Sequence, residues 1–212
     1  MKLQVALDLL STKAAIELLE NISSHVDIIE VGTPLIKIEG LIVLRAIKDK
    51  WPDKILFADL KTMDAGELEA ALAFDAGADV VSVLGLAANQ TISGAIKAAK
   101  DRGKKVVVDL IGVQPELRLQ RIDELQVLGI ETVELHAGLD EQAQVGYSLH
   151  ALLDTIKGTD VKFAVAGGVT LDTVEIVALA GAEIAVVGGG IYNAKDPLAM
   201  AKSLKEKILQ LS

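Results

Sequence analysis

The 212-residue sequence contains no cysteine, few aromatic residues and fewer basic than acidic residues. The absence of cysteine excludes disulfide bonds, thiolate metal ligands and a thiol nucleophile. Lysine and arginine total 21 against 30 aspartate and glutamate residues, which gives a formal net charge of −9. Because no local cluster of basic residues offsets this charge, the sequence argues against nonspecific nucleic-acid binding.

A long uninterrupted apolar stretch is also missing. The most apolar segment, residues 176–192, is broken by Glu183 and by several glycines, so we expect no membrane-spanning helix. The first residues lead directly into a strand-like segment, without the layout of a signal peptide. We therefore expect a cytoplasmic protein that does not associate with membranes.

Aliphatic residues dominate what is present. Hydrophobic residues make up 51% of the chain and aromatic residues only 3%, so alanine, valine, isoleucine and leucine supply most of the apolar surface. This composition is typical of parallel strands that are buried on both faces. At this length one core can bury most of the apolar surface, which predicts a single domain over residues 1–212.

One pattern recurs along the whole chain: a short β-branched run, a glycine or polar residue, and then an amphipathic stretch. It predicts eight βα units, with strands at residues 3–9, 27–32, 54–61, 80–86, 105–112, 132–138, 162–169 and 184–191. The helix-exit glycines Gly77, Gly129 and Gly181 recur at equal intervals that span two units. This regularity favours a closed (β/α)8 TIM barrel over an open doubly wound sheet.

Ionisable residues lie at the carboxyl ends of five predicted strands, where TIM barrels place their catalytic groups. They are Asp8, Glu30, Asp59 with Lys61, Asp109 and His136. Burying an unpaired charge is costly, so their recurrence indicates an active site. Taken alone, Asp8 or Asp109 is explained as well by a helix cap or an ion pair.

Asp59 and Lys61 are two residues apart on one predicted strand and therefore share a face. If that face lines the barrel, they form a carboxylate–ammonium pair. Asp64 follows at the junction with the next helix. It either belongs to the site or caps that helix, in which case Glu67 has the spacing of a capping box.

His136 lies at a predicted strand end, whereas His25 precedes a strand and His150 falls within a predicted helix. A neutral imidazole at position 136 would serve as a general base near pH 7. The other two histidines are interpreted as surface or packing residues.

The last two predicted strands end in glycines, at Gly167-Gly168 and at Gly188-Gly189-Gly190. Such glycines also make tight turns, but the loops after strands seven and eight are the usual phosphate site of TIM barrels. Several carboxylates without cysteine suggest a hard divalent cation, Mg²⁺ or Mn²⁺. Together these features indicate metal-assisted enolate formation on a phosphorylated sugar.

Five segments resemble a known family over essentially the whole chain; they are residues 3–8, 27–33, 58–66, 136–140 and 165–168. They resemble the orotidine 5′-monophosphate decarboxylase superfamily, which is marked by the Asp-x-Lys-x-x-Asp spacing of Asp59, Lys61 and Asp64. The surrounding residues are most similar to its 3-hexulose-6-phosphate synthase branch. This resemblance implies an aldehyde-lyase that adds formaldehyde to ribulose 5-phosphate reversibly, with Mg²⁺ or Mn²⁺, in a homodimer with shared active sites.

Three residues distinguish the chain from the related 3-keto-L-gulonate 6-phosphate decarboxylases. Asp109 stands where they have glutamate, and Leu139 and Gly189 stand where they have arginine. The resemblance implies that those arginines position water and hold phosphate during decarboxylation. Their absence favours capture of formaldehyde by the enediolate.

The resemblance also implies roles for single residues. Glu30 and Asp59 would bind the metal ion, and Asp8 would contact the substrate or metal-bound water. Lys61 would stabilise the enediolate, and His136 would remove the proton from carbon 1 of the sugar.

Further implied roles lie at the edge of the site. Asp64 would act in the pocket of the neighbouring subunit, and Asp109 would line the substrate channel. The backbone N–H groups of Gly168, Gly188 and Gly189 would bind the phosphate.

Three alternatives stay open at this point. A decarboxylase of the related branch would pass through the same enediolate. A noncatalytic sugar-phosphate-binding barrel would predict an incomplete set of metal and base residues. A pentose-phosphate epimerase would hold its metal with histidines on early strands, and none occurs between His25 and His136.

Overall fold

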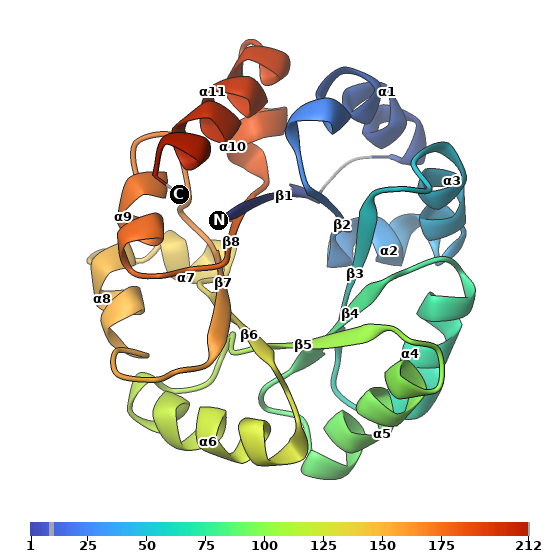
Figure 1. Cartoon of the computed structure of the whole chain (residues 1–212), viewed down its shortest axis with the longest axis vertical. Coiled ribbons are helices and arrows are strands. Elements are labelled where there is room, and N and C mark those ends of the chain that lie inside the picture. Colours follow the sequence, from blue (N-terminus) through green and yellow to red (C-terminus); the bar gives the residue numbers. More distant parts are fainter. Residues whose placement is uncertain (9–10, 212) are drawn as a thin grey trace.

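The computed structural model describes residues 1–8 and 11–211 of the chain. Its parallel strands form a closed barrel in chain order, in which β8 pairs with β1 (Figure 1). The strands are Lys2–Leu7 (β1), Ile28–Val31 (β2), Ile55–Thr62 (β3), Val80–Leu84 (β4), Lys105–Asp109 (β5), Thr132–His136 (β6), Lys162–Ala166 (β7) and Ile184–Val187 (β8). The predicted (β/α)8 TIM barrel is confirmed.

Helices surround this barrel. The α-helices are Thr12–Ile22 (α1), Thr33–Glu39 (α2), Ile42–Lys50 (α3), Gly66–Asp75 (α4), Asn89–Lys100 (α5), Arg118–Leu128 (α6), Leu139–Gln142 (α7), Leu149–Asp154 (α8), Val174–Leu179 (α9), Gly189–Tyr192 (α10) and Pro197–Gln210 (α11). Short 3-10 helices are Ser23–His25 (η1) and Pro115–Leu117 (η2).

Every predicted strand is present, but several end earlier than predicted. The eighth was predicted to reach residue 191, whereas β8 ends at Val187 and α10 follows at once. Ile191 is fully buried in that helix. In the sequence, this apolar residue therefore resembled a continuation of the buried strand. The predicted end of the first strand, Leu9, lies outside the described residues.

Local residues explain where several helices begin and end. Ser11 caps α1 by accepting a hydrogen bond from the Ala14 N–H group, and Asp196 caps α11 just before Pro197. Gly129 ends α6 in the left-handed conformation, with φ of 96°. These boundaries follow from local sequence.

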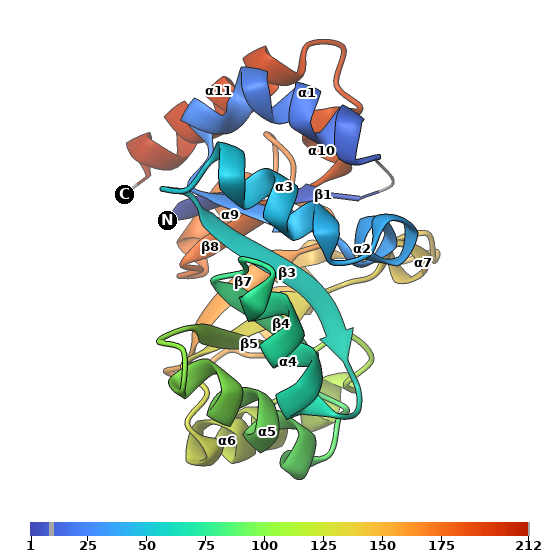
Figure 2. The same ribbon diagram turned by 90° about the vertical axis from the view of Figure 1, so that its right-hand side faces the viewer.

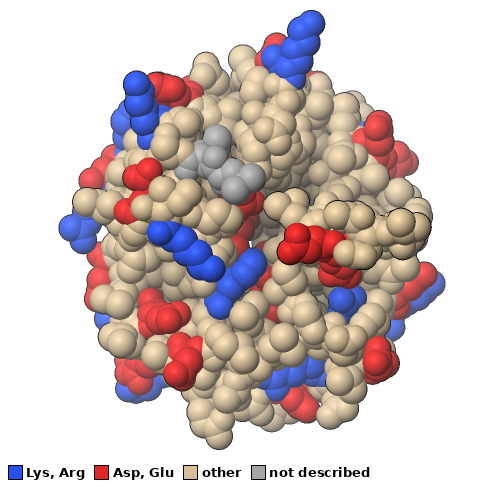
Figure 3. Space-filling view, turned by 180° about the vertical axis from the view of Figure 1, so that it is seen from behind, with Lys and Arg blue, Asp and Glu red and all other residues tan. Residues whose placement is uncertain are grey.

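The carboxyl ends of the strands lie together at one end of the barrel. In Figure 2 the β3 arrow points to the side where α2 and α7 lie, and both termini lie at the other side. Figure 3 looks onto the face at the carboxyl ends of the strands, where acidic side chains lie in the hollowed centre. In the described part of the chain we find no helix with the length and apolar character needed to cross a membrane.

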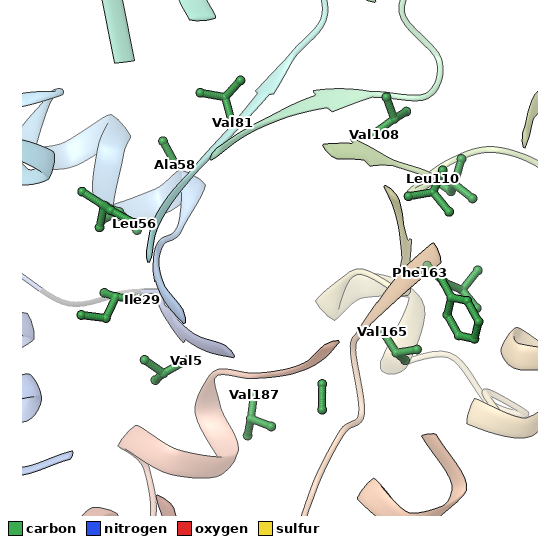
Figure 4. Close-up of a cluster of buried hydrophobic side chains, with 14 of the residues drawn as sticks. Val5, Ile29, Leu56, Ala58, Val81, Val108, Leu110, Phe163, Val165 and Val187 are labelled. Carbon is green, nitrogen blue, oxygen red and sulfur yellow. The ribbon is translucent and has the colours of Figure 1, made fainter. Parts of the chain in front are cut away.

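The main hydrophobic core lies between the barrel and its helices. Figure 4 shows labelled residues such as Val5, Ile29 and Leu56 on the outer side of the ring of strands. These three side chains are at most 1% exposed. Since side chains alternate along a strand, their neighbours Gln4, Glu30 and other alternate residues point into the barrel.

The barrel interior has apolar layers and a polar region. Ile28, Phe57 and Val107 pack together in one cluster, and small residues fill another: Ala6, Ala164, Ala166 and Val186. These small side chains belong to β1, β7 and β8. They leave room beside the polar residues that β2 to β6 contribute.

Candidate active site

A pocket of about 770 Å³ opens at the carboxyl ends of the strands. The predicted residues that line it are Asp8, Glu30, Asp59, Lys61, His136, Gly168, Gly188 and Gly189. They come from the end of the chain segment directly after β1, from β2, β3 and β6, and from the residues that follow β7 and β8. Residues far apart in the sequence therefore converge where the barrel architecture predicts.

Lys61 is held by two carboxylates. Its Nζ lies 3.0 and 2.8 Å from the two carboxylate oxygens of Asp59 and 2.9 Å from Oδ2 of Asp109. Burial acts to lower the pKa of Lys61, but the carboxylates of Asp59 and Asp109 outweigh it and raise the pKa. The ammonium group is therefore charged and directed into the pocket from β3.

The backbone at Lys61 departs from a regular strand. The β3–β4 register shifts between Ala58 and Thr62, and φ of Lys61 is +48°, which is uncommon for a residue with a side chain. Ser82 on β4 supports this bulge, because its Oγ accepts a hydrogen bond from Lys61 N and donates one to Oδ1 of Asp59. The expected pairing of Asp59 with Lys61 is present, although not through simple strand alternation.

His136 lies between two carboxylates. Its Nδ1 is 3.0 Å from Oδ2 of Asp109 and 3.3 Å from Oε1 of Glu134. Burial acts to lower the pKa of His136, but the hydrogen bonds to Asp109 and Glu134 raise it to about 11. The predicted neutral imidazole is thus corrected: in this arrangement the ring carries a proton near pH 7.

Asp109 lies behind the pocket wall. It is 0% exposed, is absent from the pocket lining and accepts hydrogen bonds from Lys61 and from the N–H group of Ile111. Burial acts to raise its pKa, but the hydrogen bond from His136 and the charge of Lys61 lower it. The expectation that Asp109 lines the substrate channel is therefore wrong, because Lys61 and His136 cover it.

Glu30 and Asp8 add further carboxylates. Glu30 is 4% exposed, and its Oε2 accepts a hydrogen bond of 2.7 Å from Nε2 of Gln4. Burial and the neighbouring Glu134 carboxylate raise the pKa of Glu30. For Asp8, burial and the Asp59 carboxylate likewise raise the pKa. The pocket therefore concentrates negative charge that favours a proton or a cation.

The donor set suits a hard divalent cation, because Glu30, Asp8 and Asp59 offer only oxygen atoms. Both carboxylate oxygens of Asp59 already accept hydrogen bonds from Lys61, and Oδ1 accepts another from Ser82; the Thr33 hydroxyl lies beside both Oδ2 and the Asp59 carbonyl oxygen. Glu30 accepts fewer hydrogen bonds, with one from Gln4. A cation at this place would therefore bind Glu30 readily, and Asp59 once one of its present donors gives way.

The glycine loops form the opposite wall. Gly168 has φ of +74°, and the helix α10 begins at Gly189 directly after Gly188. The first N–H groups of a helix have no partner within it, so they are available to an anion. Leu139, 72% exposed, lies on the same pocket rim. The structure thus brings the predicted phosphate residues and Leu139 to the same mouth.

Asp64 lies outside the pocket. It is exposed and absent from the lining, and its Oδ1 accepts a hydrogen bond from the adjacent Ala65 N. The helix α4 begins at Gly66 with Ala65 as its N-cap, and Glu67 pairs with Lys97 at 2.5 Å. The capping-box interpretation is therefore wrong, and Asp64 does not line the pocket of its own chain.

Sequence reasoning did not assign roles to Glu134, Ser82 and Thr33. Glu134 lines the pocket two residues before His136, so the alternation argument used for Asp59 and Lys61 could have identified it. Thr33 donates a hydrogen bond of 2.8 Å to Oδ2 of Asp59. Nothing in the local sequence separates Ser82 or Thr33 from ordinary strand-end hydroxyls.

Comparisons with known proteins agree with this architecture. The profile of the Orotidine 5′-phosphate decarboxylase / HUMPS family matches residues 1–204. A 3-hexulose-6-phosphate synthase from Mycobacterium gastri is 57% identical over 208 residues, which cover 98% of this chain and 100% of that protein.

Solved structures show the same similarity. A crystal structure of a 3-hexulose-6-phosphate synthase has a TM-score of 0.94 at 58% identity and covers 97% of this chain and 99% of its own. A crystal structure of a KGPDC from Streptococcus mutans has a TM-score of 0.92 at 27% identity, and covers 99% of this chain and 98% of its own.

Proposed function

The chain belongs to the Orotidine 5′-phosphate decarboxylase / HUMPS family, and we propose that within it the chain acts as a 3-hexulose-6-phosphate synthase. The reaction would be the reversible, metal-dependent addition of formaldehyde to ribulose 5-phosphate. The observation that carries this proposal is 57% identity to a synthase of that name over nearly the whole chain. A pocket that combines acidic groups, Lys61, His136 and glycine loops supports it.

The sugar would lie across the pocket between its two walls. Its phosphate would bind the N–H groups of Gly168, Gly188 and Gly189, which line one side. Carbons 1 and 2 would then face Lys61 and His136 on the other side. This orientation places the reacting end of the sugar beside the acid–base groups.

His136 would move a single proton. Asp109 holds Nδ1, so Nε2, once the ring has lost its second proton, would take the proton from carbon 1 of ribulose 5-phosphate. Carbon 1 would form a bond to the carbonyl carbon of formaldehyde, and the carbonyl π electrons would move onto its oxygen. That oxygen would take the proton back from Nε2, so the reaction needs no other proton donor.

Lys61 would stabilise the negative oxygen of the enediolate. Its contacts with Asp59 and Asp109 keep the ammonium charged, so it would act as a cation and not as an amine nucleophile. A Schiff-base mechanism is therefore disfavoured. Asp8 would contact the substrate hydroxyls from the end of β1.

Glu30 and Asp59 would hold the divalent cation, Mg²⁺ or Mn²⁺. When bound, the cation would polarise the ketose carbonyl and offset the carboxylates that hold His136 in its protonated form.

We also propose a homodimer with shared active sites. Met63 and Leu68, which flank Asp64 in the sequence, are 53% and 62% exposed. Large exposed apolar side chains beside an exposed carboxylate suit a surface that a second copy covers. Asp64 would then reach the pocket of that copy.

The deciding experiment incubates the protein with ribulose 5-phosphate and formaldehyde. We expect formaldehyde to be consumed with Mg²⁺, consumption to stop with EDTA, and excess Mg²⁺ to restore it. His136→Gln should abolish proton exchange at carbon 1, while His150→Gln, which changes an exposed histidine, should leave exchange intact. Metal-independent turnover, or CO₂ release from 3-keto-L-gulonate 6-phosphate as the main activity, would overturn the proposal.

A further inference from the structure

Glu134 is a buried carboxylate with an unsatisfied oxygen. It lies on β6, is 2% exposed and lines the pocket. Its Oε1 contacts Nδ1 of His136 at 3.3 Å, but its Oε2 is buried without a hydrogen-bond partner among the described residues. An unpaired buried acceptor destabilises the fold, so a ligand that satisfies it is expected.

Glu134 and Glu30 are electrostatically linked. Both are at most 4% exposed and line the same pocket, so their carboxylates repel each other when both are ionised. Two buried carboxylates with this repulsion are stabilised when a cation lies between them.

Asp59 has little acceptor capacity left for a cation, whereas Glu134 has some. A carboxylate offers about four acceptor positions, and Lys61 and Ser82 occupy three of those of Asp59, while the single hydroxyl proton of Thr33 is shared between Oδ2 and the Asp59 carbonyl oxygen. Glu134 has a vacant oxygen, and Glu30 accepts one hydrogen bond, from Gln4. Glu30 and Glu134 therefore both have acceptor capacity to spare.

We propose that Glu134 is a ligand of the divalent cation, together with Glu30. The inference rests on the proposed function, because it concerns the same metal site. Oxygen atoms of two carboxylates are ligands that Mg²⁺ and Mn²⁺ prefer. The cation would satisfy the unpaired Oε2 and neutralise the repulsion between the two side chains.

A different trio, Asp109, Glu134 and His136, also brings potential ligand atoms within 4.8 Å of one another. Asp109 is wholly buried there, and its Oδ2 is taken by both Lys61 and His136. A cation at this place would have to displace the Lys61 ammonium. The site between Glu134 and Glu30 needs no such displacement.

The test measures Mn²⁺ binding to the full-length protein by the electron paramagnetic resonance signal of free Mn²⁺. Glu134→Gln keeps the size of the side chain and removes its charge, so we expect Mn²⁺ affinity to fall at least about 10-fold. Glu141→Gln is the matched control, because Glu141 is an exposed residue on the rim of the same pocket. It should change the affinity less than about 3-fold, as expected for screened surface charges.

Thermal unfolding gives a second measurement and a check on folding. Without metal, Glu134→Gln should unfold at the same temperature as the wild type or at a higher one, because repulsion is removed. Mn²⁺ should raise the unfolding temperature of the wild type much more than that of the variant. Glu134→Asp, which keeps the charge on a shorter side chain, should recover part of the affinity.

His136→Gln distinguishes a cation bound by Glu134 and Glu30 from one bound by the trio Asp109, Glu134 and His136. It should bind Mn²⁺ at least as tightly as the wild type, because it removes a neighbouring cation. Equal Mn²⁺ affinity in Glu134→Gln and wild type would overturn the inference, and so would loss of affinity in His136→Gln. If Mn²⁺ binds as expected but formaldehyde is not consumed, the proposed reaction fails while the metal ligand stands.

Discussion

At the scale of single residues, the site is a chain of paired charges. Asp59, Lys61, Asp109 and His136 are linked by contacts of 2.8–3.0 Å, and Glu134 contacts the imidazole at 3.3 Å. Lys61 and His136 each have two carboxylate partners, so both side chains are held in their charged forms. The protonation of one residue here therefore depends on its neighbours more than on its own chemistry.

The raised pKa of His136 predicts a pH-dependent contribution to stability. A histidine with a raised pKa in the folded state stabilises the fold fully below its unfolded pKa, and this contribution is lost as pH rises through the folded pKa. The stability difference between wild type and His136→Gln should therefore shrink between pH 6.5 and about 11. Urea unfolding at several pH values measures it.

The matched control is His150→Gln, which changes an exposed histidine on α8. Its stability difference from wild type should stay small and nearly constant across the same range. If the His136→Gln difference does not change with pH, the imidazole is not held in its protonated form by Asp109 and Glu134.

Ser82 supports two site residues with one hydroxyl. Ser82→Ala would leave the Lys61 N–H group unpaired beside a strained backbone and remove a donor from Asp59. We expect a loss of about 1–3 kcal/mol in the free energy of unfolding. Activity should fall about 10-fold or more, because small displacements of catalytic groups are costly.

Ser93→Ala provides the comparison, since Ser93 is exposed on α5. Its unfolding free energy should stay within about 0.5 kcal/mol of the wild type. Chemical denaturation and steady-state kinetics on both variants check the prediction. Similar behaviour of the two would mean that the bulge of β3 does not depend on Ser82.

At the scale of elements, the loop after β7 depends on close backbone packing. Gly167 has φ of +93°, and a Cβ atom there would overlap the carbonyl oxygen of Ala137. Gly158 has nearly the same φ, +92°, but a Cβ atom there would meet nothing within 4 Å. The two positions therefore separate backbone strain from steric contact.

Gly158→Ala should lower the free energy of unfolding by about 1–2 kcal/mol, the usual cost of left-handed backbone in a residue with a side chain. Gly167→Ala should lose at least about 2 kcal/mol more, because the clash forces the loop away from β6. It should also raise KM for the phosphorylated sugar. Thermal unfolding and kinetics test both, and equal effects would show that the loop can move without cost.

At the scale of the whole molecule, the position of Asp64 makes a dimer testable by complementation. Asp64→Asn and His136→Gln should each be nearly inactive alone. In mixed dimers one site would combine the intact His136 of one subunit with the intact Asp64 of the other. Random mixing should then restore about a quarter of the wild-type activity.

Co-refolding the two variants and measuring formaldehyde consumption tests this prediction. Mixing His136→Gln with Glu30→Gln is the control, because both residues line the pocket of one subunit. That mixture should stay nearly inactive. If the Asp64→Asn mixture also shows no recovery, Asp64 does not act across a shared interface.

The sequence by itself determined the architecture and most of the pocket. Strand and helix periodicity predicted the eight βα units, since the two periods depend only on backbone geometry. Strand-end positions then predicted that Asp8, Glu30, Asp59, Lys61 and His136 would converge. These predictions succeed because a closed parallel barrel brings all strand ends to one face.

Only the tertiary structure decided how those residues interact. The β3 bulge, the burial of Asp109 behind Lys61 and His136, and the outward position of Asp64 depend on contacts between different strands and loops. The protonated state of His136 and the unpaired oxygen of Glu134 depend on them as well. Electrostatic interactions fall off with distance through space, so sequence spacing alone does not fix them.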